Sequence, residues 1–331
     1  MKVAVVILNW NGKNLLEQFL PSVVNFSKEA TVYAADNASS DDSVSFISEN
    51  FQTVKIIQNS VNGGYAKGYN DALSHLSEDI FVLLNSDVEV TENWLVPVIS
   101  EFKKDNKLAA AQPKILDYKN KAYFEYAGAA GGFIDKFGYP FCRGRIFDSL
   151  EKDEGQFDDI VEIFWATGAC LFIRKTAFQE INGFDEDFFT HQEEIDLCWR
   201  LKSEGGIIKY FGTSTVYHVG GATLTSANPK KTFYNFRNTL FMLVKNVKGY
   251  RVWGILIARL LLDGIAGVLF LLQGNLKHTF AIIKAHLSFY TLLPKILKKR
   301  RLNTRDLQYY FVTSIVLEYF VRKKKRFKDL L

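Results

Sequence analysis

A short polar tip with one carboxylate follows a run of five apolar residues. Asn85, Ser86 and Asp87 come directly after Ile-Phe-Val-Leu-Leu at residues 80–84. Such a run predicts a strand that is buried on both faces of a parallel sheet. A carboxylate at the carboxyl end of that strand lies where open α/β sheets bind ligands, and it can hold a divalent cation against a diphosphate. The same residue types are common in turns and helix caps, so a simple strand-to-helix turn is the alternative.

A second cluster of reactive side chains opens a helix that we predict over residues 193–203. Its first turn contains Glu193, Glu194 and Asp196. Acids are electrostatically favoured at this end of a helix, which is a sufficient structural reason for some of them. Acids beside aromatic residues also suit a general base that deprotonates an alcohol. Asp196 and Arg200 are spaced i,i+4, which predicts an ion pair that orients the segment.

The elements that position these residues form a predicted doubly wound, mainly parallel α/β sheet. Strand and helix signals alternate through the first half, as in sheets with right-handed crossovers. Strands are expected at residues 2–8, 30–35, 54–58 and 80–84, and helices at residues 14–26, 41–51 and 65–76. Because parallel strands end at one edge, we expect the polar residues after them to converge on one crevice. The predicted donor-binding residues at these strand ends are Asn9, Asn11, Asp36, Asn62, Gly63, Gly64, Asn70, Asn85 and Ser86.

Individual strand tips carry different chemistry. Asp36 can accept hydrogen bonds from a ribose hydroxyl or a base imino N–H group. Gly63 and Gly64 allow close backbone approach at a helix N-terminus, which favours anions. His218 ends a later strand-like run, and imidazole with carboxylate and phosphate oxygens makes a suitable Mn²⁺ or Mg²⁺ shell, although a structural histidine is the alternative. No G-x-G-x-x-G follows the first strand, which argues against nicotinamide chemistry.

The rest of the chain predicts a two-part domain with a helical extension. A Gly-rich stretch at about residues 118–159 predicts a long loop that is either functional or partly disordered. Strands are expected at residues 161–173 and 207–216, and mostly helix beyond residue 230. We therefore expect a nucleotide-binding half at residues 1–117, an acceptor and catalytic half at residues 118–245, and a membrane-associating region at residues 246–331.

Composition indicates a folded protein with a basic C-terminal part. Of the 331 residues, 48% are hydrophobic, which excludes disorder. The three cysteines form no CxxC pair, which argues against a zinc site and fits a reducing compartment. The basic residues gather late in the chain, at Lys295, Lys298, Lys299, Arg300, Arg301, Arg305, Arg322, Lys323, Lys324, Lys325, Arg326 and Lys328. Because apolar helices adjoin them, we expect an anionic membrane surface as partner and no nucleic acid.

Two apolar segments in the C-terminal region could either cross a membrane or lie on its surface. Residues 252–272 are long enough to span a bilayer, but Arg259 and Asp263 interrupt them at i,i+4 spacing. Residues 279–293 are shorter. A single crossing would place basic flanks on both sides, against the positive-inside tendency. Two helices lying in the membrane surface are therefore expected, with true spanning and an oligomer-burying face as alternatives.

Taken in order, these motifs resemble family 2 glycosyltransferases of the GT-A fold, in particular the rhamnosyltransferase-like members of bacterial polysaccharide assembly. The resemblance runs from residue 3 to about residue 245. Residues 5–12 resemble the opening strand and nucleotide loop, 36–41 the base-binding segment, 85–87 the DxD motif, 166–170 with Gly168 the strand beneath the donor sugar, 193–197 the E-D-x-D-L motif, and His218 a late metal-contacting histidine.

The resemblance implies an inverting enzyme that moves a sugar from a nucleotide-diphosphate donor, dTDP-rhamnose or a UDP-hexose, to a glycan or polyprenyl-linked glycan hydroxyl. The protein is then peripheral at the cytoplasmic face of the cell membrane. Asp87 and His218 would hold Mn²⁺ or Mg²⁺, and Glu194 would be the base. Asn85 replaces the first acid of DxD and Glu194 replaces the usual Asp. These departures leave a non-catalytic nucleotide-sugar-binding scaffold as the alternative, while a nucleotidyltransferase would need a Gly-rich basic signature after the first strand.

Overall fold

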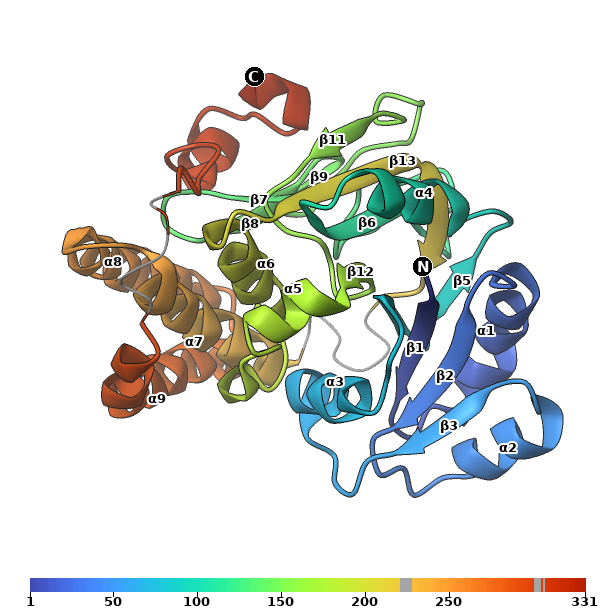
Figure 1. The fold of residues 1–331 in the computed structure, drawn as a ribbon. Helices are drawn as coiled ribbons and strands as arrows, with labels where there is room; N and C mark the ends of the chain where they lie inside the picture. The colour runs from blue at the N-terminus through green and yellow to red at the C-terminus, as the bar shows by residue number, and fades with distance from the viewer. Residues whose placement is uncertain (221–227, 301–304, 306) are drawn as a thin grey trace.

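The computed structural model describes residues 1–220, 228–300, 305 and 307–331. Arg301, one of the basic residues of the predicted membrane-associating region, lies outside these residues. A mixed sheet runs through the protein with helices on both faces, and three further helices gather at one side of it (Figure 1).

The main sheet confirms the predicted strand-and-helix alternation at its N-terminal end. In spatial order its strands are β11 (Ile160–Glu162), β13 (Ile207–His218), β6 (Leu108–Asp117), β12 (Cys170–Arg174), β4 (Ile80–Asn85), β1 (Val3–Asn9), β2 (Thr31–Asp36) and β3 (Lys55–Gln58), and β5 (Val88–Val90) pairs with β13. The four strands from β4 to β3 are parallel. Asn9 pairs with Asp36 and Leu8 pairs with Asn85, so three strand tips share one edge.

Helices cover both faces of this sheet because its central strands are apolar on both faces. In β1, Val5 and Ile7 pack into one hydrophobic cluster, and Ala4 and Val6 pack into the other. This two-sided burial explains the unbroken apolar runs in the sequence. The helices of this part are α1 (Lys13–Phe26), α2 (Ser43–Asn50), α3 (Gly64–Ser74), α4 (Val96–Lys104), α5 (Lys175–Glu180) and α6 (Glu193–Ser203).

Two predictions for the middle of the chain are wrong. The single strand expected at residues 161–173 is two strands, β11 at the sheet edge and β12 between β4 and β6, because the chain turns at Gly168 and Ala169. The long loop expected at residues 118–159 contains a small antiparallel sheet. Its strands are β7 (Gly132–Ile134), β8 (Pro140–Cys142), β9 (Arg145–Ile146) and β10 (Ser149–Leu150). These strands are too short to produce a clear period-two pattern.

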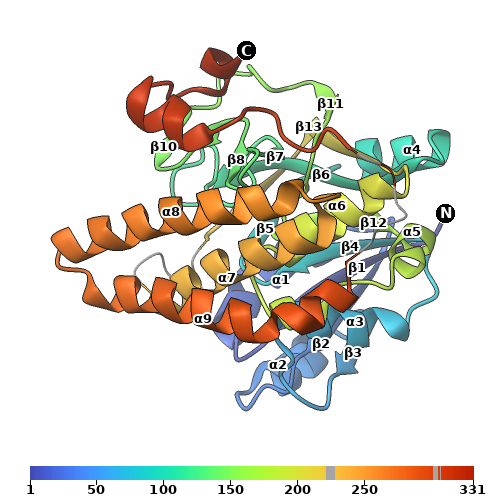
Figure 2. The same ribbon diagram turned by 90° about the vertical axis from the view of Figure 1, so that its left-hand side faces the viewer.

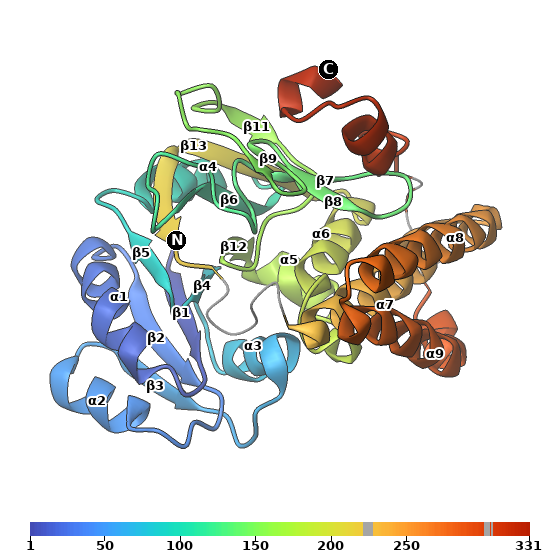
Figure 3. The ribbon, with the colours of Figure 1, turned by 180° about the vertical axis from the view of Figure 1, so that it is seen from behind.

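Three helices follow the sheet, as predicted for the region beyond residue 230. They are α7 (Pro229–Asn246), α8 (Arg251–Leu272) and α9 (Leu276–Lys298). The helices α8 and α9 run antiparallel across one face of the protein (Figure 2), and from behind all three lie beside α6 (Figure 3). Arg259 pairs with Asp263 at 2.9 Å, as the spacing predicts, and Asp263 also lies 3.0 Å from His286 of α9. This buried contact joins the two helices.

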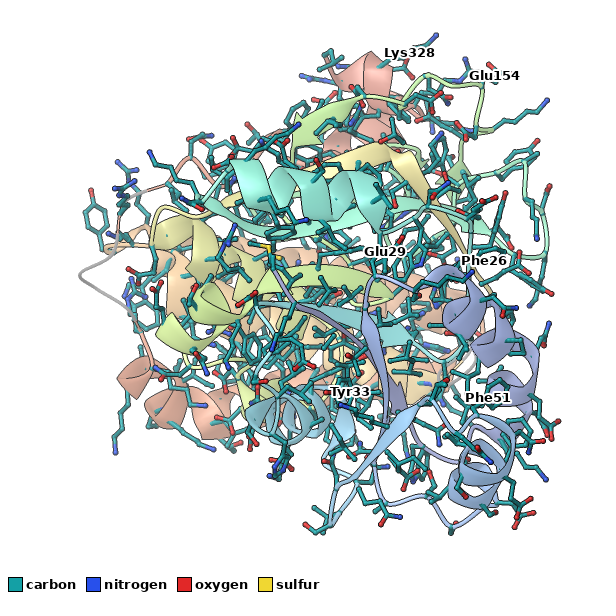
Figure 4. All side chains as sticks on the ribbon, turned by 45° about the vertical axis from the view of Figure 1, so that its right-hand side comes forward. Phe26, Glu29, Tyr33, Phe51, Glu154 and Lys328 are labelled. Atoms are coloured by element: carbon teal, nitrogen blue, oxygen red, sulfur yellow. The ribbon has the colours of Figure 1, made fainter. Side chains whose placement is uncertain are left out.

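The C-terminal segment returns to the small sheet. The rings of Phe311 and Phe327 lie 5.0 Å and 5.4 Å from Phe133, and the backbone N–H of Ile315 donates to the buried carboxylate of Asp135. Two short helical turns, η2 (Leu317–Val321) and η3 (Phe327–Leu330), complete the chain. Lys328 accordingly lies at the opposite end of the protein from Phe51, which follows α2 (Figure 4). The predicted extension therefore packs on the α/β domain.

Candidate active site

Asp87 and His218 meet at the carboxyl end of β4. The short strand β5 pairs with the end of β13 so that His218 lies opposite Val88. The sequence did not predict this strand, which brings a late histidine to the β4 tip. His218 Nε2 lies 3.1 Å from Asp87 Oδ1 and 3.5 Å from Asn85 Nδ2, and both Asp87 and His218 are buried.

A second carboxylate, Glu125, flanks His218 from the other side. Its Oε2 lies 3.4 Å from His218 Nδ1, and no sequence pattern predicted this residue because it follows no predicted strand. Burial by itself lowers the pKa of His218, but Glu125 and Asp87 raise it to about 10. Burial raises the pKa of Asp87, and the contact with His218 lowers it below its usual value. The position of His218 between Asp87 and Glu125 therefore favours its protonated form when no cation is bound.

The tips of β1 and β2 are tied together by their own polar side chains. Asn9 Nδ2 donates to Asp36 Oδ1 at 3.3 Å and to Ser39 Oγ at 3.2 Å. Asp36 Oδ2 accepts from the backbone N–H of Ser39 at 3.0 Å, and Asn11 Oδ1 accepts from the backbone N–H of Ser40 at 2.7 Å. The structure thus brings Asn9, Asn11 and Asp36 together as predicted, with Asp36 at the centre.

The start of α3 contacts the loop that precedes α6. Asn62 Oδ1 accepts from the backbone N–H of Gly64, and the N–H groups of Tyr65 and Ala66 both donate to the carbonyl of Phe189. A Cβ atom on Gly64 would lie 2.7 Å from Phe189, and its φ of 74° is also unfavourable for other residues. Protein contacts therefore occupy this helix N-terminus, which the sequence predicted to face an anion.

Asn70, another predicted donor-binding residue, also has a packing role. Its side-chain amide exchanges two hydrogen bonds with the backbone of Phe184, at 2.9 Å each, and its Nδ2 lies 3.2 Å from Glu186. These bonds fix the body of α3 to the segment that leads into the acidic cluster.

Tyr65 connects this loop to the β4 tip. Its hydroxyl donates to the carbonyl of Gly168 at 2.8 Å, and the next residue, Ala169, accepts from the backbone N–H of Asn85. Burial, followed by the charges of Tyr69, Glu193 and Glu194, raises the pKa of Tyr65. The partly buried Tyr65 therefore contacts Gly168 directly, and Glu194 lies near enough for its charge to act on the Tyr65 hydroxyl.

The acidic cluster lies on a strained loop with unpaired polar atoms. Phe189, His191 and Gln192 have φ angles of 63°, 68° and 70°. Four buried side-chain atoms here have no hydrogen-bond partner among the residues that the structure describes: His191 Nε2, Gln192 Oε1, Glu193 Oε2 and Glu194 Oε2. Strain and unpaired polar groups at one place are typical of a site that is completed by a ligand.

The two glutamates hold their protons unusually tightly. Burial raises the pKa of Glu194 to about 7, while backbone N–H groups of the helix start oppose this effect. Burial and the neighbouring Glu194 raise the pKa of Glu193 further. Glu193 is 4% exposed, whereas the side chain of Glu194 is partly accessible. A partly accessible carboxyl group with a pKa near neutrality suits a general base.

Asn238 of α7 holds the strained loop, and sequence reasoning missed it. Its Nδ2 lies within 2.9 Å of three carbonyl oxygens, those of Phe188, Thr190 and His191. The adjacent Arg237 also donates to the carbonyl of Phe188. Because α7 is distant in sequence and shows no motif, only the folded chain reveals this contact.

Asp196 has different surroundings from Glu193 and Glu194. It is fully buried, accepts from Arg200 Nε and Lys245 Nζ at 2.8 Å each, and accepts from Asn246 Nδ2 at 2.8 Å. The predicted pair with Arg200 is confirmed. Burial raises the pKa of Asp196, but Lys245 and Arg200 lower it to below its ordinary value. These contacts fit an orienting role for Asp196 rather than the catalytic role predicted from the motif.

The fit of a divalent cation follows from the donor atoms at the β4 tip. Two adjacent ligands of a cation with bonds of about 2.1 Å lie roughly 3 Å apart, and Asp87 Oδ1 and His218 Nε2 have that separation. Within the described residues no group of three or more His, Cys, Asp or Glu side chains could hold a metal alone. The residues therefore fit a cation that shares its shell with diphosphate oxygens.

Fold and site together define a glycosyltransferase of the GT-A type. The family model for glycosyl transferase family 2 matches residues 4–181, just over half of the chain, and the protein belongs to this family. It catalyses glycosyl transfer with inversion, which is general for this family.

Relatives and solved structures agree with this assignment. The chain is 24% identical over 230 residues to the N-acetylglucosaminyl-diphospho-decaprenol L-rhamnosyltransferase of Mycobacterium tuberculosis, covering 65% of this chain and 75% of that protein. The structure of S. aureus TarS 1-349 with UDP-GlcNAc has a TM-score of 0.57 at 14% identity, covering 90% of this chain and 83% of the TarS 1-349 chain. GalNAc-T7 with UDP, GalNAc and Mn²⁺ has a TM-score of 0.55 at 19% identity, and the match covers 66% of this chain but 43% of GalNAc-T7. At these identities the two structures show a shared fold.

The face formed by α8 and α9 exposes many large apolar side chains. Ile257, Leu261 and Leu272 are 64%, 65% and 77% exposed, and Phe280 and Leu287 of α9 are about as exposed. Both helices are long and apolar enough to cross a bilayer, by length and composition alone. An apolar patch of this extent marks an interaction surface.

Proposed function

We propose that the protein transfers a sugar from a nucleotide-diphosphate donor, dTDP-rhamnose or a UDP-hexose, to a hydroxyl group of a lipid-linked glycan. The observation that carries the proposal is the pairing of Asp87 with His218 at the β4 tip, next to which Tyr65 donates a hydrogen bond to Gly168 and Asn85 donates one to Ala169. The name of the mycobacterial relative, which acts on a decaprenol-linked GlcNAc, supports rhamnose and a polyprenyl acceptor.

Residues at different strand ends bind different parts of the donor. Asp36, held by Asn9 and Ser39, is placed to accept a hydrogen bond from the nucleoside. Asp87 and His218 would hold Mn²⁺ or Mg²⁺, which lowers the free energy of the negative charge on the leaving nucleoside diphosphate. To serve as a ligand, His218 must give up the proton that it shares with Asp87. Asn85 contributes a neutral hydrogen bond, since an amide is a weaker metal ligand than a carboxylate.

Glu194 is the proposed base. Its unpaired Oε2 accepts the proton of the acceptor hydroxyl while that oxygen attacks the anomeric carbon from the face opposite the diphosphate. Burial and the neighbouring Glu194 raise the pKa of Glu193, which disfavours a second negative charge beside Glu194. The transition state resembles an oxocarbenium ion, as in glycoside hydrolysis.

A membrane location follows from the same substrate. The exposed apolar face of α8 and α9 would lie on the cytoplasmic membrane surface, where a polyprenyl-linked acceptor is presented. The free thiols of Cys142, Cys170 and Cys198, all buried, are compatible with a cytoplasmic protein.

A transfer assay tests the proposal. Purified protein is incubated with a panel of nucleotide sugars, a polyprenyl-diphosphate-linked GlcNAc acceptor and Mn²⁺ or Mg²⁺, and products are detected by mass spectrometry. We expect one donor to be consumed, with loss of turnover on chelation. Nucleotide-sugar binding in thermal shift without any turnover would instead support the non-catalytic scaffold, whose sequence support is the presence of Asn85 and Glu194 in place of Asp.

A further inference from the structure

A basic cavity lies at the root of α8, beside the exposed apolar face. Its volume is about 480 Å³. Four cationic side chains line it, Lys136 from the small sheet, Lys248 and Arg251 around the start of α8, and Arg305 from the C-terminal segment. No carboxylate is among the described residues that line this cavity, and none of the four cations forms an ion pair within the described part of the chain. Four like charges around one space repel one another, so an anion bound there would be stabilised.

Aromatic side chains give the cavity a fixed wall. The rings of Trp199 and Tyr309 stack at 4.5 Å, and the hydroxyl of Tyr309 donates to the carbonyl of Lys136 at 2.9 Å. These contacts fix the positions of three separate chain segments around the cavity. The cavity is thus built by the tertiary fold rather than by one loop.

The position of the cavity connects it to the membrane surface. Gly254 of α8 lines it, and the next turn of the same helix exposes Ile257. Trp253, immediately before Gly254, is 45% exposed, and tryptophan favours the interface between headgroups and acyl chains. If the apolar face lies on a bilayer, the cavity lies at its margin, at the depth of the phosphate groups.

We propose that this cavity binds the phosphate of an anionic membrane lipid and so orients the enzyme on the bilayer. The occupant is a lipid headgroup because the apolar face adjoins the cavity, whereas a soluble anion would not need that surface. The inference rests on the proposed membrane association and adds a specific headgroup site to it. The cavity and the proposed base lie on different faces of α6, since Trp199, which lines the cavity, is five residues beyond Glu194, or about 140° around the helix.

A matched pair of substitutions in α8 tests the site without changing charge. A Cβ atom at Gly254 or at Gly264 would meet no other atom within 4 Å, so Gly254→Leu and Gly264→Leu should both fold. Only Gly254 lines the cavity. Binding of the full chain is measured by flotation with vesicles of phosphatidylcholine alone and with phosphatidylcholine and phosphatidylglycerol in equal parts. Thermal melting confirms that each variant is folded.

We expect the wild type and Gly264→Leu to bind the anionic vesicles about tenfold more tightly than the neutral ones, and Gly254→Leu to lose most of that preference. Equal preference in both variants would overturn the site. A second comparison uses charge: Lys248→Gln with Arg251→Gln should lose more than Lys277→Gln with Lys284→Gln, which lie on α9 outside the cavity. Equal losses would show general surface attraction and overturn the site.

The remaining outcomes separate the two proposals. If the wild type binds neither vesicle, membrane association itself is wrong and the headgroup site falls with it. If it binds both vesicles equally, the apolar face holds the membrane and the cavity does not. If inorganic phosphate raises the melting temperature of the wild type while Gly254→Leu binds vesicles normally, the cavity takes a soluble anion and the lipid assignment is wrong.

Discussion

The substitution Glu194→Gln should abolish transfer and yet make the folded protein more stable at alkaline pH. The pKa of Glu194 is raised in the folded state, so the folded state binds this proton more tightly than the unfolded chain. Ionisation of Glu194 therefore destabilises the fold. The destabilisation is absent below the unfolded pKa of 4.5, grows as the pH rises through about 7, and is constant above that. Gln, which has nearly the same shape and no charge, removes it.

The magnitude follows from the shift. A change from 4.5 to about 7 corresponds to about 3 kcal/mol at roughly 1.4 kcal/mol per pKa unit. The side chain is partly accessible, so solvent screening reduces this figure, and we expect about 1 to 2 kcal/mol. For a chain of 331 residues, that corresponds to a rise of roughly 1 to 3 °C in melting temperature. Loss of the base should lower turnover by about 10² to 10⁴-fold.

The assay compares thermal melting of wild type and Glu194→Gln at pH 5 and at pH 8, with transfer measured in parallel. The matched control is Glu49→Gln, which removes an exposed charge on α2. We expect the gain in melting temperature at pH 8, a much smaller one at pH 5, and none at either pH in the control. A gain of the same size at both pH values would refute the argument from burial. Full transfer activity in a folded Glu194→Gln variant would refute the assignment of the base.

Three further outcomes follow from the site. In a Mn²⁺ titration of the transfer rate, Asp87→Ala should lower turnover by at least about 10²-fold and weaken its dependence on Mn²⁺, whereas Asn85→Ala should lower turnover by less than about tenfold. Equal losses of turnover in the two variants would contradict the separate roles of Asp87 and Asn85. Asn238→Ala removes the hydrogen bonds to three loop carbonyls and should destabilise the fold by about 2 to 3 kcal/mol in urea unfolding. The variant should also have a lower kcat with little change in KM for the donor. A loss of stability without a change in kcat would show that Asn238 has a purely structural role. Burial raises the pKa of Asp185, but Lys245 and Lys299 lower it to below its ordinary value of 3.8. The contribution of Asp185 to stability is therefore complete above pH 3.8 and is lost as the pH falls through the folded pKa. In urea unfolding, Asp185→Asn should cost about 3 kcal/mol at pH 7 and progressively less below pH 4.

The N-terminal half of the fold could be predicted because its signals are local. Each central strand is an apolar run, since both of its faces are buried, and each is followed by a polar tip. The helix at α6 was predicted with its observed bounds because acids open it and a basic residue lies near its end. The middle of the chain could not be predicted in this way. The run at residues 161–173 is mostly apolar, and only packing decides that the chain turns at Gly168 and forms two strands at different positions in the sheet.

The residues of the site also divide into those that a local sequence pattern predicts and those that only the tertiary structure reveals. Asp87 and Asp36 could be found from the sequence because each follows a buried strand directly. Glu125 and Asn238 could not, because no local pattern marks a residue whose partners lie far away in the chain. Glu125 was found only through its contact with His218, and Asn238 through three carbonyl groups of a strained loop.

The sequence by itself determined the parallel half-sheet, the polar strand tips, the acid cluster and the apolar C-terminal helices, because strand burial and helix periodicity are encoded by neighbouring residues. Only the tertiary structure decided how these parts act on one another. The pairing of β5 with β13 brings His218 to Asp87, and desolvation at the start of α6 sets the pKa of Glu194. The basic cavity likewise exists because four separate segments meet at the root of α8. Contacts between residues far apart in the chain carry no local signature, and it is these contacts that set the charge and geometry of the site.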